Sequence, residues 1–293
     1  MPHLAFYLWA LGAIGAYATI SLVLDTACRA LFAARQIGSG RRARAKVERH
    51  KVAALFLINT LQIAVALAIA DSAHEHGLGG LYTLELDSPA KLLLVLLQSF
   101  FILLVFDANF FWLHRLAHRY KRIFVKIHAE HHRVRYPNVW HLQYQHPLDY
   151  LMTTAAPMAW IALLPIPLTT QSYLLAIVTA SFLNIAGHCG YEVSNTLIGL
   201  PTPNGWAAYA DPRRRWLSRA FNNVVHHDLH HQSSACNYSL YFTHWDRLCG
   251  TLHSDTDRVD HYVRRGARLG LSHERAGRRG HGLLEASSRP ESS

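Results

Sequence analysis

The sequence predicts an all-α, multi-span membrane protein with four to five apolar spans or hairpins and a cytoplasmic helical cap rich in histidine. Of its 293 residues, 51% are hydrophobic and only 16% are charged, which is less charge than an ordinary soluble domain carries. The apolar residues are gathered into long runs, as membrane spans require. Histidines recur at helical spacing on segments that leave these runs or lie close to them.

Residues 1–113 are expected to hold three spans, Leu4–Leu24, Val52–Ala70 and Leu92–Leu113. The first has no charge, no basic start and no small-residue cleavage site, so we expect an uncleaved span. Residues 29–51 carry eight Lys or Arg and one Glu, which predicts a cytoplasmic loop. Asp107 and Asn109, in the last turns of the third span, either support a site just beyond it or lie at the level of the headgroups.

Residues 114–260 are expected to form the functional region, with an apolar hairpin at 150–187 inside it. Prolines interrupt the first arm, so the hairpin either crosses the membrane or re-enters it. In both cases the passes are even in number, and His188 returns to the cytoplasmic side on which His114 starts. Residues 261–293 are rich in Arg, Gly and Ser and predict a disordered basic tail.

Nine histidines fall into four sets with helical spacing on one side of the membrane. Residues four apart, or three and four apart, share one side of a helix, and imidazole binds Fe, Zn, Cu or Ni. Nine are too many for one ion and enough for two. Asp228 and Glu192 either orient these rings or are surface carboxylates. The predicted metal ligands are His114, His118, His128, His131, His132, His188, His227, His230 and His231.

Two other classes of protein are not supported by the composition. The net charge is +10, but the basic residues lie beside the apolar runs, where positive charge orients membrane proteins. No nucleic-acid module appears in the sequence. We therefore expect no nucleic-acid partner. The four cysteines form no C-x-x-C pair, which argues against a disulfide scaffold or a zinc ribbon.

Five short segments resemble the histidine boxes of the fatty acid hydroxylase and sterol desaturase superfamily. They are HRLAH (114–118), HAEHH (128–132), QHPLD (145–149), HCGYE (188–192) and HDLHH (227–231). The stretch NYSLYFTHWDRLCGT, from Asn237 to Thr251, resembles the sequence that follows the last box in that family. The resemblance covers about Phe106 to His253. It implies the same nine ligands and adds His146 as a tenth.

The resemblance implies an integral membrane enzyme with two iron ions that uses O2 to hydroxylate or desaturate a C–H bond of a lipid, of the sterol or fatty-acyl type. It implies no catalytic residue beyond the metal ligands. Electrons would come from a carrier such as cytochrome b5 or a ferredoxin, with NAD(P)H behind it, since the chain has no dinucleotide fingerprint after a strand and no recognisable haem domain. Zinc can replace iron in purified protein.

Two alternatives remain open at this stage. A membrane zinc hydrolase would use fewer ligands, and Glu130 stands between His128 and His131, but the spacing is H-x-x-H-H instead of H-E-x-x-H. A non-enzymatic membrane metal-binding protein would place its histidines along a path within the spans.

His226 points about 100° away from His227 around a helix and is not expected to be a ligand.

Overall fold

The computed structural model describes residues 2–31, 37, 47–134, 138–191 and 220–257. Three of its helices are long and apolar enough to cross a membrane. They are α1 (Pro2–Leu31), α2 (Arg49–Glu75) and α3 (Pro89–Arg119). These helices contain the three predicted spans. α3 continues past the predicted end at Leu113, so it carries the first histidines rigidly out of the apolar run.

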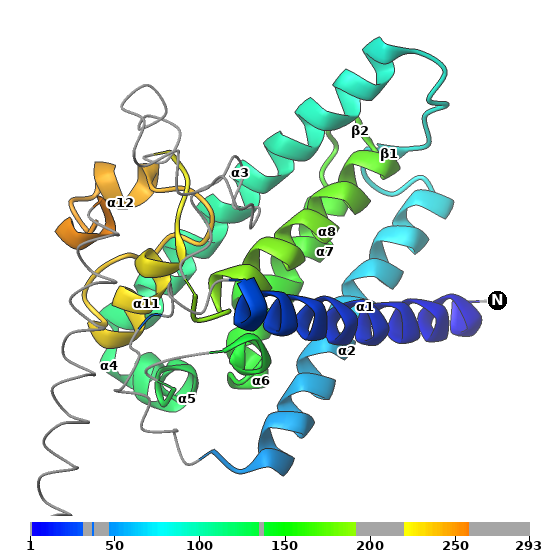
Figure 1. The fold of residues 1–293 in the computed structure, drawn as a ribbon. Helices are drawn as coiled ribbons and strands as arrows, with labels where there is room; N and C mark the ends of the chain where they lie inside the picture. Colours follow the sequence, from blue (N-terminus) through cyan, green and yellow to red (C-terminus); the bar gives the residue numbers. More distant parts are fainter. Residues whose placement is uncertain (1, 32–36, 38–46, 135–137, 192–219, 258–293) are drawn as a thin grey trace, which may run out of the picture.

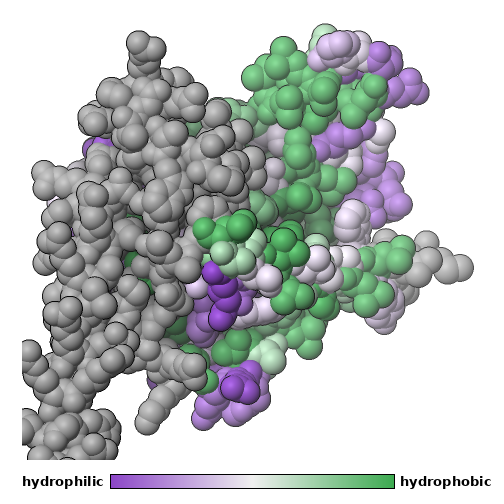
Figure 2. Space-filling view, in the orientation of Figure 1, coloured by the Kyte–Doolittle hydropathy of each residue, from purple (hydrophilic) through white to green (hydrophobic). Residues whose placement is uncertain are grey.

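The outer faces of these helices are apolar, as contact with lipid requires. Large hydrophobic side chains are exposed along α1, α2 and α3, for example Leu11, Ile58 and Leu97. Figure 2 shows extensive hydrophobic surface over the described helical part of the molecule, interrupted by hydrophilic patches. The fold therefore belongs in a bilayer.

The apolar hairpin is helical in both arms. Its first arm joins α6 (Pro147–Tyr150), η4 (Leu151–Ala155) and α7 (Ala156–Ala162), and its second arm is α8 (Thr170–Gly187). The wider π-helical turn of η4 comes just before Pro157, which has no N–H to donate to a regular α-helix. Neither arm is among the three helices that can span a membrane by length and hydropathy in the described part of the chain.

A small clasp closes the end of the bundle opposite the histidines (Figure 1). The two-residue strands β1 (Leu81–Tyr82) and β2 (Leu168–Thr169) pair in parallel. Position 80 must be glycine, because any side chain there would clash with the carbonyl of Ile166. The Gln98 side chain accepts a hydrogen bond from the Thr169 N–H at 2.9 Å. The clasp ties α3 and the hairpin together far from the functional region.

Short helices pack around the other end of α3 and carry most of the remaining histidines (Figure 1). α4 (Lys121–Ile123), η2 (Phe124–His128) and α5 (Ala129–His132) follow α3 directly, and η3 (Val139–His141) precedes the hairpin. α11 (Val224–Gln232), α12 (His244–Leu248) and η7 (Ser254–Asp257) complete the cap. The predicted tail at 261–293 lies outside the described residues, as does most of the predicted basic loop at 29–51.

Candidate metal centre

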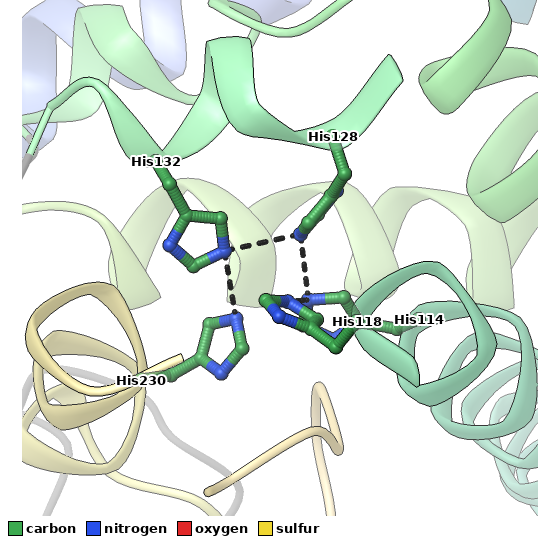
Figure 3. Close-up of side chains that lie close together, drawn as sticks. All are labelled: His114, His118, His128, His132 and His230. Atoms are coloured by element: carbon green, nitrogen blue, oxygen red, sulfur yellow. Dashed lines mark hydrogen bonds between the residues drawn. The ribbon is translucent and has the colours of Figure 1, made fainter. Parts of the chain in front are cut away.

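Five of the nine histidines form a first histidine group, made of His114, His118, His128, His132 and His230. α3 supplies two of them, η2 and α5 supply one each, and α11 supplies the last, so three separate stretches of chain meet here (Figure 3). The Nε2 atoms of His114 and His128 are 3.1 Å apart, and those of His132 and His230 are also 3.1 Å apart. The rings point their Nε2 atoms into one shared space.

The other four histidines form a second histidine group, made of His131, His188, His227 and His231, and all four are buried. The Nε2 atoms of His188 and His227 are 2.8 Å apart, and those of His227 and His231 are 3.0 Å apart. The two groups adjoin, because the rings of His132 and His231 lie with their centroids 5.1 Å apart. Two ions would therefore sit close to each other.

The H-x-x-H-H spacing divides each set between the two groups. On a helix, positions i and i+4 differ by about 40° around the axis, whereas position i+3 lies about 60° to the other side. His128 and His132 accordingly enter the first group while His131 enters the second. α11 does the reverse, with His227 and His231 in the second group and His230 in the first. One repeated spacing thus serves two ions.

The protonation of several rings is fixed by what their Nδ1 atoms touch. Nδ1 of His114 lies 2.8 Å from the Tyr238 carbonyl oxygen, and Nδ1 of His230 lies 2.7 Å from that of Cys236. In the second group, Nδ1 of His188 lies 2.8 Å from the Asn184 carbonyl oxygen. A carbonyl only accepts hydrogen bonds, so each Nδ1 carries the proton and each Nε2 keeps its lone pair.

The Asp149 carboxylate accepts the hydrogen bond from His128 Nδ1, with 2.8 Å between Oδ2 and Nδ1. The Nε2 atoms of His114 and His128 lie 3.1 Å apart, an arrangement that a bound cation would stabilise. Imidazole nitrogens about 2.1 Å from a transition metal, at neighbouring coordination positions, are separated by about 3 Å. The donor set therefore fits a bound metal ion.

Burial also favours the uncharged rings that metals require. It lowers the pKa of His131, His227 and His231 well below the ordinary value for histidine. It lowers the pKa of His188 to about 4 and that of His230 to about 3, although backbone hydrogen bonds act in the opposite direction. The rings are ready to bind a metal at neutral pH without first losing protons.

One segment, residues 236–246, which runs into the start of α12, packs against the first group. Its carbonyls at Cys236 and Tyr238 position two ligands, and Asn237 between them has a φ of 57°, which asparagine tolerates better than most residues. Asp246 accepts hydrogen bonds from the N–H groups of Tyr238 and Ser239, both at 2.9 Å. Burial alone would raise the pKa of Asp246, but its hydrogen bonds with His226 and Ser239 lower it further than burial raises it.

Asp107 anchors the same segment to α3. Its Oδ1 accepts hydrogen bonds from the N–H groups of Leu240, at 2.9 Å, and Tyr241, at 2.7 Å. The carboxyl is completely buried, and its hydrogen bonds to the segment that positions two histidines favour the supporting role of the two predicted for it. Asn109 instead donates to the Val105 carbonyl at 2.8 Å, within its own helix.

The structure places the tenth predicted ligand, His146, outside both groups. Its side chain is exposed, and its Nδ1 accepts a hydrogen bond from the Leu148 N–H at 3.2 Å, which caps the start of α6. We leave it out of the ligand set proposed below. His226 also lies outside both groups, as expected, with its Nε2 3.2 Å from Asp246 Oδ2.

Two carboxylates, Asp228 and Glu192, were predicted either to orient the rings or to lie on the surface. Asp228 accepts a hydrogen bond from Gln232 Nε2 at 2.5 Å, and Glu192 lies outside the described residues. Asp149 was not predicted to contact His128, although it ends the QHPLD segment. A carboxylate three residues after the histidine of that segment was the available signal.

Comparison with known proteins identifies the family. A family model described as fatty acid hydroxylase matches residues 99–251, about half of the chain. The chain belongs to the fatty acid hydroxylase family. The match to the fatty acid hydroxylase family contains all nine clustered histidines and most of the range over which the sequence resembled the superfamily. No solved structure matches the chain.

Curated relatives act on several kinds of lipid. Cholesterol 25-hydroxylase from Homo sapiens is 32% identical over 170 residues, 55% of this chain and 53% of the relative. The sphingolipid C4-hydroxylase of Schizosaccharomyces pombe is 31% identical over 160 residues, 53% of this chain and 47% of the relative. A delta(7)-sterol 5(6)-desaturase from Gibberella zeae is 26% identical over 154 residues, 53% of this chain and 41% of the relative. The chain spans about half the length of these relatives.

Proposed function

We propose that this protein is an O2-dependent membrane oxidoreductase that hydroxylates or desaturates a C–H bond of a lipid, of the sterol or fatty-acyl type. The observation that carries the proposal is the pair of adjoining histidine groups, in which nine imidazoles converge and four Nδ1 atoms are held by carbonyls or a carboxylate. Membership of the fatty acid hydroxylase family and the names of the relatives support it.

We propose iron as the resident metal, two ions in all, one held by His114, His118, His128, His132 and His230 and the other by His131, His188, His227 and His231. Iron bound there would supply O2 activation and oxidation of an unactivated C–H bond. The protein fixes the orientation of the rings through Asp149 and backbone carbonyls. Burial of the second group keeps water from the reaction. Zinc can occupy the same rings in purified protein.

The electrons are proposed to come from a separate carrier of the cytochrome b5 or ferredoxin type, supplied by NAD(P)H. Exposed basic residues lie next to the first histidine group on α3, α4 and η2, among them Arg119, Arg122 and Lys126. This surface suits an acidic carrier, because opposite charges accelerate association. On the basis of the positive-inside rule, we propose that this surface and the metal centre lie on the cytoplasmic side of a multi-pass membrane protein.

The division of the chain follows from the same proposal. Residues 1–113 form the N-terminal membrane spans with their basic cytoplasmic loop, 114–260 form the histidine-box catalytic region with its hairpin, and 261–293 form a disordered basic tail. The family match at 99–251 overlaps the second region and enters the third span. That overlap fits a catalytic region built on the extension of α3.

Lipid profiling of cells with and without this chain tests the proposal. We expect a product heavier by one oxygen or lighter by two hydrogens, formed only in air and lost in the His131→Ala variant. A membrane zinc hydrolase would instead cleave a bond and continue to turn over without O2. A metal-binding protein without activity would change no lipid, and either result would overturn the proposal.

A further inference from the structure

A pocket opens beside the second histidine group. It lies between the end of α8 and the segments 221–224 and 240–241, and its cavity volume is about 40 Å³. His188 and His227 line it, together with apolar residues such as Leu183 and Leu240. The space admits one substituent or chain end of a lipid, and a group placed there would touch two of the proposed metal ligands.

Three asparagines line this otherwise mostly apolar pocket, and they differ in how their side chains are used. Asn223 is committed to the fold, since its Oδ1 accepts from the His226 N–H at 2.7 Å and its Nδ2 donates to the Thr256 carbonyl at 3.0 Å. Asn222 donates from Nδ2 to the Ser239 carbonyl at 3.0 Å. Its buried Oδ1 has no hydrogen-bond partner among the described residues.

The third asparagine, Asn184, has a side-chain amide that makes no hydrogen bond with any residue in the described part of the chain. The residue is only 8% exposed and lines the pocket. Its backbone carbonyl accepts the hydrogen bond from His188 Nδ1 at 2.8 Å, so it stands one helical turn before a proposed ligand. The amide is therefore available to a group that enters the pocket, the space where substrate would lie.

We propose that Asn184 is a substrate-positioning residue. Its amide, with the Oδ1 of Asn222, hydrogen-bonds a hydroxyl or amide group of the lipid and so fixes which carbon meets the metal centre. This inference rests on the proposed function. The four residues from Asn184 to His188 rise about 6 Å along the helix, so the polar group of the substrate lies only a few carbons from the carbon that is oxidised.

The hydrogen bonds that the three asparagine side chains make with the protein differ, and the difference supports a substrate-binding role for Asn184 over a purely structural one. A structural asparagine is held by hydrogen bonds to the protein, as Asn223 is. Asn184 and Asn222 together offer two acceptors and one NH2 donor group to a ligand. A site built to hydrogen-bond a substrate group discriminates strongly against molecules that lack the group, because its own buried atoms are then left unpaired.

The test compares wild type with Asn184→Leu, which keeps the approximate shape of the side chain and removes its hydrogen bonds. Val178→Leu is the matched control, since Val178 is on the same helix, is 59% exposed and does not line the pocket. Each full-length protein is reconstituted with its reductant and incubated with a total membrane lipid extract. Mass-spectrometric fragmentation locates the new oxygen or double bond, and metal content and melting temperature are measured in parallel.

We expect the wild-type product to carry the change within a few carbons of an existing hydroxyl or amide. Asn184→Leu should form at least about tenfold less of it, or shift the position oxidised, with unchanged metal content and an equal or higher melting temperature. Equal product at the same position in Asn184→Leu, a product oxidised far from any polar group, or loss of metal in this variant overturns the inference. Absence of any oxidised product from wild type overturns the proposed function itself.

Discussion

Asp149 Oδ2 lies 2.8 Å from His128 Nδ1, and both side chains are almost completely buried. Asp149 belongs to α6, at the start of the hairpin, while His128 ends η2. The contact therefore links the membrane hairpin to the first histidine group. A buried carboxylate in this position makes the ring a stronger ligand and fixes its orientation.

Asp149→Asn should lower metal affinity or activity by roughly 10- to 100-fold, the usual effect of losing such a partner. The reason is that the amide keeps the size of the side chain but removes its charge from the His128 N–H. Metal analysis and product formation measure the effect. Asp87→Asn, which removes an exposed carboxylate 2.8 Å from Lys91 Nζ, should leave both unchanged. Full metal content and activity in Asp149→Asn would contradict the role assigned to the contact.

His131→Ala and His230→Ala should each abolish turnover while the protein still inserts in the membrane, because the spans do not depend on the metal. His131 belongs to the second group and His230 to the first. Each variant should therefore lose about one of two metal equivalents. Elemental analysis per polypeptide, with His50→Ala as an exposed control, measures this. Loss of both ions from either variant would show instead that the groups bind cooperatively.

The convergence of nine of the ten histidines predicted as ligands could be predicted from sequence, because helical spacing and membrane topology bring these histidines to one place. Their division into two groups could not. Helical spacing turns the i+3 member of each set away from its i and i+4 partners, but which histidines of α5 and α11 share a group depends on the angle at which these two helices face each other. Those angles arise from tertiary packing between residues about a hundred positions apart, as for His132 and His230.

The spans were predictable for a different reason. Long apolar runs are visible in any window of the sequence, so the three N-terminal helices were predicted in the correct places. The extension of α3 to Arg119 was missed, since hydropathy falls where the helix continues into the cap. The β1–β2 clasp was also missed, because two-residue strands leave no periodic pattern.

His146→Ala should keep both metal ions and activity within about twofold, with a loss of stability of about 1 kcal/mol or less from the helix cap. The physical reason is that the exposed His146 ring only accepts from the Leu148 N–H. His146→Asn restores a capping acceptor and should recover that stability. Thermal unfolding and metal analysis distinguish the effects. Loss of a metal ion in both variants would return His146 to the ligand set.

Asn237 offers a test of how the segment 236–246 holds the first group. Its side chain donates to the His226 carbonyl at 2.9 Å and accepts from the His253 N–H at 2.7 Å. Asn237→Gly loses these bonds but keeps the positive φ, whereas Asn237→Ala also strains the backbone, by about 1 kcal/mol more. We expect melting temperature and metal content to fall in the order wild type, Gly, Ala. Equal stability of the two variants would contradict the conformational part of the argument.

The metal-free protein should lose stability as the pH falls below about 6.5, the ordinary pKa of histidine in an unfolded chain. Burial lowers the pKa of His188 to about 4 and of His230 to about 3 in the folded protein. Between those values and 6.5 the unfolded chain binds protons that the folded protein excludes, so the free energy of unfolding decreases by about 1.4 kcal/mol per pH unit for each such ring. Above pH 7 these two rings contribute no pH dependence, since they are neutral in both states.

Melting temperatures of the metal-free protein in detergent, measured between pH 8 and pH 5, test the direction. We expect a plateau at high pH and a steepening decline below pH 6.5. His188→Gln should make the decline shallower, because one excluded proton is removed, while His50→Gln, at a side chain that is 82% exposed, should leave the profile unchanged. A melting temperature that rises on acidification would mean that the rings accept protons in the folded state, and the neutral, metal-ready arrangement inferred from their carbonyl contacts would then be wrong.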